Sequence, residues 1–156
     1  MKDKKKWMMA AAAATGALIG RICYECRHFT TEYYDVASDK IPEAFEGFRF
    51  VVLSDLHNYD FDQGNRQLLR AIERLKPDAV MIAGDMIDAH PGADMSAAVR
   101  MVRDLCDRWP VYFGNGNHEQ RMKEHPDRYE ESYFEYKEAL ENAGAVFLEN
   151  QTVECP

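Results

Sequence analysis

Short apolar runs alternate with amphipathic segments from residue 48 onward. Four apolar runs are predicted to be strands, at 48–54, 79–83, 109–113 and 146–148. Three segments with apolar residues at helical spacing lie between them, at 65–76, 94–108 and 127–143. The first run is nearly continuous in apolar character, which is typical of a strand covered on both faces. Strands alternating with helices predict an α/β fold with a right-handed, mostly parallel sheet and crossover helices.

Smaller features refine these elements. Pro77 is expected to end the first helix, and Gly144 suits the end of the third. Cys106 lies on the apolar stripe of the second helix, so it is expected to be a packed core thiol. The tyrosines at 129–136 are likewise expected in the core.

The segment between the N-terminal region and residue 48 has two parts. Residues 29–37 are rich in aromatic and β-branched side chains, which predicts an early strand. Residues 41–47 contain Pro42 and Gly47 and predict a linker.

The first 24 residues have the pattern of a membrane element. Lys4, Lys5 and Lys6 precede an uncharged stretch from Trp7 to Gly20. A positive start followed by an apolar stretch is typical of a signal sequence or signal anchor. Extension through Arg21 to Tyr24 brings the segment close to the length of a membrane span and places an aromatic ring at its end. The basic residues then predict an N-terminus in the cytoplasm and an extracytoplasmic body.

Other interpretations of this segment stay open. It could be cleaved, which would make the protein secreted, or it could be a helix of a soluble core. Cys23 and Cys26 form a lone C-x-x-C after it. Two further ligands at suitable spacing are missing nearby, so a zinc site is not favoured over an incidental or reversibly acylated pair.

The charge balance excludes one class of partner. The chain has 27 acidic and 19 basic residues, a net charge of -8, and its excess of positive charge is confined to the N-terminal segment. Binding to nucleic acid through a basic surface needs clustered Lys and Arg. No nucleic-acid partner is therefore expected.

Polar residues follow three of the predicted strands. They form the segments 54–58 (SDLHN), 84–88 (GDMID) and 114–119 (GNGNHE). In open α/β sheets, ligands bind beyond the carboxyl ends of the strands. The sequence therefore predicts one site built from three strand ends.

The residue types in these segments suit metal ions. On an extended chain Asp55 and His57, two residues apart, would point to the same side and could converge on one ion. Asp85 on the neighbouring strand could share its two oxygens between two ions, and Asn117 offers a neutral amide oxygen. Mixed oxygen and nitrogen ligands suit Mn, Fe or Zn better than Ca.

The ordered motifs D-x-H, G-D and G-N-H-E resemble the calcineurin-like metallophosphoesterase family, in particular its membrane-associated bacterial YkuE-like phosphodiesterase branch. The resemblance implies the N-terminal half of a four-layer α/β sandwich, preceded here by the hydrophobic helix. It implies two divalent metal ions that activate a hydroxide to attack phosphorus. Asp55 and His57 would bind the first ion, Asp85 would bridge both and Asn117 would bind the second. His118, oriented by Asp55, would stabilise the transition state and assist the leaving oxygen.

The resemblance also implies ligands that the sequence lacks. The family pattern continues with another histidine and a G-H-x-H motif, whereas the histidine that follows His118 here is His125, in a charged segment. We therefore expect residues 48–156 to be a partial phosphoesterase domain, from a truncated or frame-shifted chain, with weak or no activity alone. The expected substrate is a small or lipid-linked phosphate ester. The alternative is a non-catalytic remnant, or one part of a split protein that needs a C-terminal partner.

The remaining candidates are assigned structural roles. Asp88 and Glu119 are expected to order the loops around the site rather than to bind metal. His28, His90 and His125 lack partners at useful spacing and are expected to face solvent. His90 follows the Asp85 loop, so the alternative that it replaces a missing ligand stays open.

Overall fold

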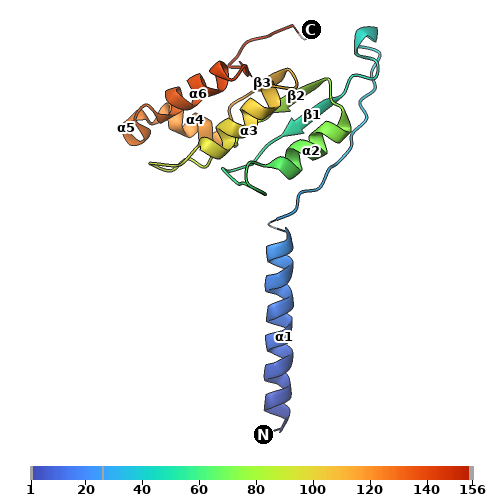
Figure 1. Cartoon of the computed structure of the whole chain (residues 1–156), viewed down its shortest axis with the longest axis vertical. Helices are drawn as coiled ribbons and strands as arrows, with labels where there is room; N and C mark the ends of the chain where they lie inside the picture. Colours follow the sequence, from blue (N-terminus) through green and yellow to red (C-terminus); the bar gives the residue numbers. More distant parts are fainter. Residues whose placement is uncertain (1, 26, 155–156) are drawn as a thin grey trace. The chain divides into compact units, whose positions relative to one another are not determined.

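The computed structural model describes residues 2–25 and 27–154, which form two separate units. The first unit ends at Ser38 and contains helix α1, Lys2–Glu25. The second unit begins at Asp39 and contains the sheet with its helices (Figure 1). Cys26 lies outside the described residues, so the structure does not describe the C-x-x-C pair.

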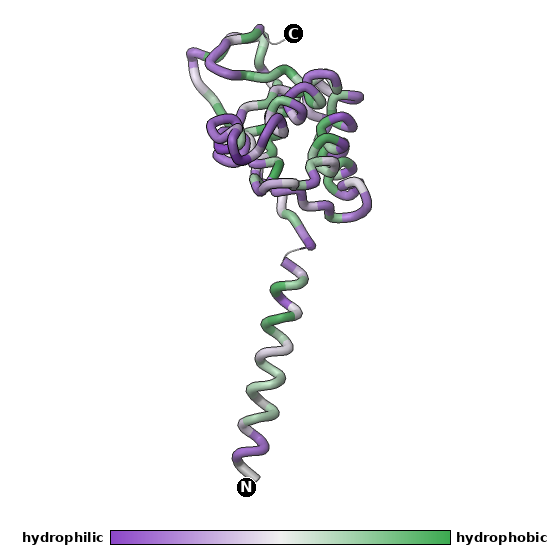
Figure 2. Tube along the Cα trace, turned by 90° about the vertical axis from the view of Figure 1, so that its left-hand side faces the viewer, coloured by the Kyte–Doolittle hydropathy of each residue, from purple (hydrophilic) through white to green (hydrophobic). Residues whose placement is uncertain are grey.

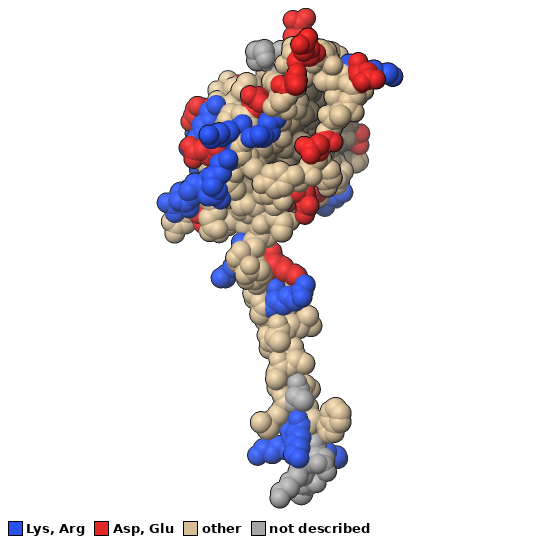
Figure 3. Space-filling model, turned by 90° about the vertical axis from the view of Figure 1, so that its right-hand side faces the viewer, with Lys and Arg blue, Asp and Glu red and all other residues tan. Residues whose placement is uncertain are grey.

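Helix α1 is long and apolar enough to cross a membrane. Its candidate span, Lys4–Glu25, has 22 residues, and its most apolar 18-residue window is exposed. At 1.5 Å per residue this is roughly 33 Å, against a hydrocarbon core of about 30 Å. Figure 2 shows its apolar middle, and Figure 3 shows the lysines gathered at its N-terminal end. A signal sequence shares these properties, so the helix is a candidate span.

The prediction of a strand at residues 29–37 is wrong. These residues have no regular secondary structure, and Tyr33, Tyr34 and Val36 are at least 77% exposed. β-branched and aromatic residues form a strand only where a neighbouring strand accepts their backbone hydrogen bonds. Residues 41–47, predicted to be a linker, form irregular chain around a short 3-10 helix, η1 (Glu43–Phe45).

All four strands predicted after the linker are present in one parallel sheet. They are β1 (Phe50–Leu53), β2 (Ala79–Ile82), β3 (Val111–Phe113) and β4 (Val146–Phe147), in the spatial order β1-β2-β3-β4. The connecting helices are α2 (Arg66–Leu75), α3 (Ser96–Cys106), α4 (Asn117–Glu124), α5 (Pro126–Tyr129) and α6 (Ser132–Asn142). The predicted α/β class is confirmed.

Within this unit the helices cover a single face of the sheet (Figure 1). Right-handed crossovers that always step in the same direction place every connecting helix on one side. On that face Val80, Ile82 and Phe113 are buried in the core. On the other face Val52 is 63% exposed, Met81 39% and Val146 38%. The expectation that β1 is covered on both faces is therefore wrong within the described structure.

The chain between β3 and β4 differs from the single helix predicted at 127–143. Three helices, α4, α5 and α6, occupy it. Helix α4 was missed because most of its residues are charged or polar, and it buries only Glu119 and Met122. Helix α5 ends at Tyr129, because the next residue, Glu130, has a positive φ of 53° that does not continue a helix.

The predicted core residues are confirmed. Tyr129, Tyr133 and Tyr136 are at most 3% exposed. Cys106 packs against the core, and burial raises the pKa of its thiol to about 11. A thiol with so high a pKa stays protonated at neutral pH and is unreactive.

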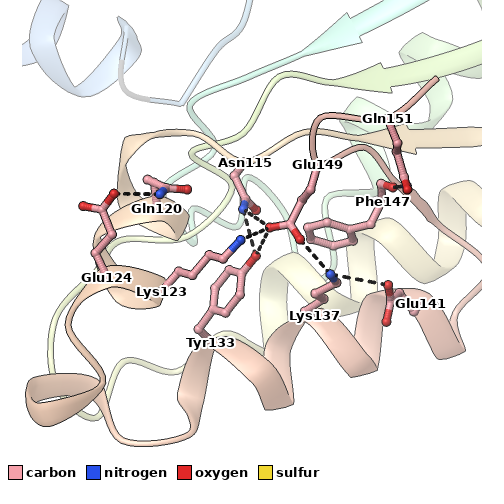
Figure 4. A network of polar contacts seen from close by, with 10 residues as sticks. All are labelled: Asn115, Gln120, Lys123, Glu124, Tyr133, Lys137, Glu141, Phe147, Glu149 and Gln151. Atoms are coloured by element: carbon pink, nitrogen blue, oxygen red, sulfur yellow. Dashed lines mark hydrogen bonds and ion pairs between the residues drawn. The ribbon is translucent and has the colours of Figure 1, made fainter.

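A polar cluster fastens the chain that leaves β4 to the helices and to the loop after β3 (Figure 4). Oε1 of Glu149 accepts hydrogen bonds from Lys123 Nζ (2.8 Å), Tyr133 Oη (2.7 Å) and Asn115 Nδ2 (2.9 Å). Oε2 accepts from Lys137 Nζ at 2.9 Å. The hydrogen bond from Lys123, followed by those from Tyr133 and Lys137, lowers the pKa of Glu149 to about 2.

Because this pKa lies below its ordinary value of 4.5, Glu149 stabilises the fold above about pH 4.5 and loses that effect as pH falls toward 2. We expect Glu149→Gln to lower the free energy of unfolding at pH 7 by about 2 kcal/mol, after allowance for partial exposure. The difference between parent and variant should shrink toward pH 2. Urea titrations between pH 7 and 2 measure it, and a constant difference would contradict the assignment.

Candidate metal centre

Three loops meet at the carboxyl ends of β1, β2 and β3. Backbone hydrogen bonds join the first two, from Asp55 N to Gly84 O (3.3 Å) and from His57 N to Asp85 O (3.0 Å). Gly114 N, after β3, donates to Ile82 O at 2.9 Å. The polar segments predicted from the sequence are therefore brought together at one sheet edge.

The second and third loops touch through their glycines. A Cβ on Gly84 would lie 1.9 Å from the backbone nitrogen of Gly116, and one on Gly116 would lie 2.4 Å from Asp85 N. Gly84 also has a φ of +80°, which side-chain-bearing residues rarely adopt. Glycine is therefore required at both positions for the loops to approach this closely.

The site residues of the first loop do not lie on an extended strand, contrary to the geometry assumed from their spacing. Asp55 and His57 have φ angles of 58° and 48°, and Asp85 has 52°. Each such left-handed residue costs on the order of 1–2 kcal/mol. Strained backbone of this kind concentrates at functional sites, because surrounding contacts must hold it.

Asp55, His57 and Asp85 form the first group of possible metal ligands. One ligand atom from each lies within 4.8 Å of the others. His57 Nε2 is 3.5 Å from Asp55 Oδ1. The first two side chains are exposed while Asp85 is 8% exposed, so the group opens to solvent from a buried base. Two carboxylates and one imidazole fit a transition-metal ion.

His57 also belongs to a second group, with Asp88 and His118. His118 Nδ1 is 3.3 Å from Asp88 Oδ1, and the ring meets that of His57 edge to face at 4.8 Å between centroids. The carboxylate beside His118 is therefore that of Asp88, and no described contact joins His118 to Asp55. The expectation that Asp55 orients His118 is corrected on this point. The sequence placed Asp88 near the site, as a residue that orders its loops, but gave no signal that it lies beside His118.

The hydrogen bonds of His118 define its neutral form. The backbone N–H of Ala89 donates to Nδ1 at 2.8 Å, so in the neutral ring the proton is on Nε2. The contact with Asp88 is an ion pair only when the ring is protonated, so the two contacts belong to different protonation states. Nε2 carries a proton in both states, and its loss leaves a neutral ring only when the starting ring is protonated.

Glu119 ties the second and third loops together, in agreement with the role expected for it. Its carboxylate is fully buried and accepts hydrogen bonds from Asp85 N (2.8 Å), Met86 N (3.1 Å) and Gly116 N (3.0 Å). Asp85 Oδ1 in turn accepts from His118 N at 2.8 Å. The carboxylate of Asp85 is thereby fixed in direction, and its other oxygen makes no described hydrogen bond.

Asn117 and the remaining histidines complete the set of predicted positions. Asn117 is the first residue of α4, exposed and adjacent to His118. His28, His90 and His125 are exposed, as expected. Asp55, His57 and Asp85 could thus hold one cation, whereas no described contact joins the side chain of Asn117 to them.

Comparison with known proteins agrees with this geometry. Residues 48–154 match the family described as calcineurin-like phosphoesterase. A Danio rerio protein described as a transmembrane protein with metallophosphoesterase domain is 32% identical over 122 residues, covering 76% of this chain and 28% of that protein. The uncharacterized metallophosphoesterase YkuE of Bacillus subtilis (strain 168) is 33% identical over 85 residues, covering 52% of this chain and 29% of YkuE. The chain thus spans less than a third of the length of these relatives, and it belongs to the calcineurin-like phosphoesterase family.

Proposed function

We propose that the chain carries a two-metal site for hydrolysis of phosphate esters. The observation that carries this proposal is the group of Asp55, His57 and Asp85, whose ligand atoms lie within 4.8 Å of one another in a metallophosphoesterase domain. Asp55 and His57 would hold the first ion, Asp85 would hold both, and Asn117 would hold the second. When bound, two divalent cations acidify water and neutralise charge on the phosphoryl oxygens.

His118 is the proposed proton donor. Attack of water on phosphorus breaks the bond to the leaving oxygen, which needs a proton. The protonated ring of His118 would give that proton from Nε2, with Nδ1–H facing Asp88 instead of accepting from Ala89 N–H. Asp88, 3.3 Å from Nδ1, would stabilise the protonated ring as a positioning residue.

We propose Mn, Fe or Zn as the metal, because the ligands combine oxygen and nitrogen.

The proposed substrate is a small or lipid-linked phosphate ester. Its lipid-linked form is suggested by the candidate span in α1 and by the transmembrane description of the Danio rerio relative. In this arrangement residues 1–24 would anchor the site at a membrane, with the body outside the cytoplasm.

The ligand set in this sequence predicts weak turnover. The sequence offers four proposed protein ligands for two ions, and it has no G-H-x-H motif. The four are Asp55, His57, Asp85 and Asn117. We propose that full activity needs further ligands from another polypeptide segment. The second candidate function, favoured by the same shortage, is a non-catalytic or split-protein part that binds metal without turnover.

Asp85→Asn tests the proposed function. We expect the full chain in detergent to bind Mn²⁺, and the variant to bind it at least tenfold more weakly, because a bridging carboxylate is replaced by a neutral amide. Free Mn²⁺ measured by electron paramagnetic resonance gives the affinity. Asp107→Asn, an exposed carboxylate after α3, is the control and should bind as the parent does.

Hydrolysis of bis-p-nitrophenyl phosphate separates the two candidates. Weak Mn²⁺-dependent turnover that disappears in Asp85→Asn supports the enzyme. Mn²⁺ binding without turnover supports the non-catalytic candidate. Equal Mn²⁺ affinity in the parent and Asp85→Asn contradicts both.

A further inference from the structure

We infer that Glu149 is a positioning residue for the metal-binding loop, which it holds through the side chain of Asn115. This inference rests on the proposed function, since it concerns the loop that presents Asn117 and His118. The four donors around Glu149 come from three places in the chain: Asn115 from the loop after β3, Lys123 from α4, and Tyr133 and Lys137 from α6 (Figure 4). Glu149 itself follows β4, where Leu148 N donates to Phe113 O at 2.8 Å.

Asn115 holds the start of this loop through its side chain. It lies between Gly114 and Gly116, which have none. Its Nδ2 donates to Tyr133 Oη at 2.8 Å and to Glu149 Oε1 at 2.9 Å. Its Oδ1 is buried without a hydrogen-bond partner in the described structure, so the direction of the amide is set by these two acceptors.

A carboxylate is required at position 149 because every neighbour is a donor. Glu149 Oε1 receives three donors and Oε2 receives Lys137. Burial, with the hydrogen bond to Glu149 as the next cause, raises the pKa of Tyr133 to about 12, so its hydroxyl remains a donor. A glutamine at this position has a single acceptor oxygen and would turn an NH₂ group toward Lys137 or Asn115.

The position of this loop matters because it packs tightly against the loop after β2. Gly116 lies so close to Gly84 and Asp85 that a Cβ would not fit between them. Asn117 and His118 follow directly, and His118 N donates to Asp85 Oδ1 at 2.8 Å. A small displacement of Asn115 would therefore shift Asn117, the proposed ligand of the second ion. Asp55 and His57 lie on the loop after β1, which makes no described hydrogen bond to residues 114–118, and would stay in place.

Two measurements on the full chain in detergent test this inference with Glu149→Gln. The control, Glu141→Gln, removes the same charge from a residue 3.9 Å from the same Lys137, with no described contact to Asn115. Amide hydrogen exchange without metal should become at least tenfold faster in residues 114–118 of Glu149→Gln and should stay faster than exchange in β2, which the expected loss of global stability also speeds. If exchange in residues 114–118 is unchanged, or rises only to the rate of β2, the loop opens only with the whole fold and the inference is overturned.

Mn²⁺ titration is the second measurement. In Glu149→Gln the weaker of two Mn²⁺ sites should lose about tenfold in affinity, while the tighter site and both sites of Glu141→Gln stay unchanged. Equal weakening of both sites, or no weakening, would overturn the inference while the proposed function stands. Absence of Mn²⁺ binding in the parent would overturn the proposed function, and the exchange measurement would still decide whether Glu149 holds the loop.

Discussion

Gly84→Ala is expected to lower the free energy of unfolding by at least about 3 kcal/mol. The added Cβ would lie 1.9 Å from Gly116 N and 2.3 Å from Gly116 Cα, so two loop backbones would have to separate. Strain from the positive φ adds on the order of 1 kcal/mol. Urea unfolding of the full chain, followed by the fluorescence of Trp109, measures the change.

Gly92→Ala is a matched control for this prediction. Gly92 has a φ of +72°, close to the +80° of Gly84, but no atom lies within 4 Å of a Cβ built on it. Its substitution should cost only the strain, about 1 kcal/mol. Equal losses in the two variants would show that the contact between the loops is not what requires glycine at position 84.

Glu119→Gln is expected to lower the free energy of unfolding by about 2–4 kcal/mol. The side chain is fully buried, and its two oxygens accept three backbone N–H groups from two loops. An amide would keep one acceptor oxygen and turn its NH₂ toward a backbone donor, which leaves a buried donor unpaired. Because the loops carry Asp85 and His118, Mn²⁺ affinity should fall as well.

Glu124→Gln is the control for Glu119→Gln. Glu124 lies on the same helix, is exposed, and accepts a hydrogen bond only from Gln120 among the contacts described for it. Its substitution should change stability by less than about 0.5 kcal/mol. A loss in Glu119→Gln no larger than this would mean that its carboxylate does not hold the two loops together.

The strands and the helices α2 and α3 were predictable because their buried positions are apolar and recur with the period of a strand or a helix. Residues 79–83 are apolar because β2 is central in the sheet, and 94–108 are apolar at helical spacing because α3 packs on it. Residues 29–37 have the composition of a strand but do not form one. A strand needs a partner, and whether a partner is adjacent depends on parts of the chain far away in sequence.

The candidate site shows the same division. Asp55, His57 and Asp85 could be named from their motifs, since polar residues after buried strands must meet at one sheet edge. The carboxylate beside His118 could not be named in this way. Asp55 has a positive φ in the first loop, and Asp85 has one in the loop that carries Asp88. These backbone angles set which carboxylate lies beside His118, and the local sequence does not specify them.

By itself, the sequence determined the α/β class, the place of the site at the strand ends and the types of group that form it, because hydrophobic periodicity and residue chemistry are local properties. Only the tertiary structure decided which carboxylate faces His118, why Gly84 and Gly116 cannot carry side chains, and that Glu149 reaches Asn115. Those features are contacts between segments distant in sequence. Their geometry is set by the packing of the whole sheet and its helices, to within tenths of an ångström.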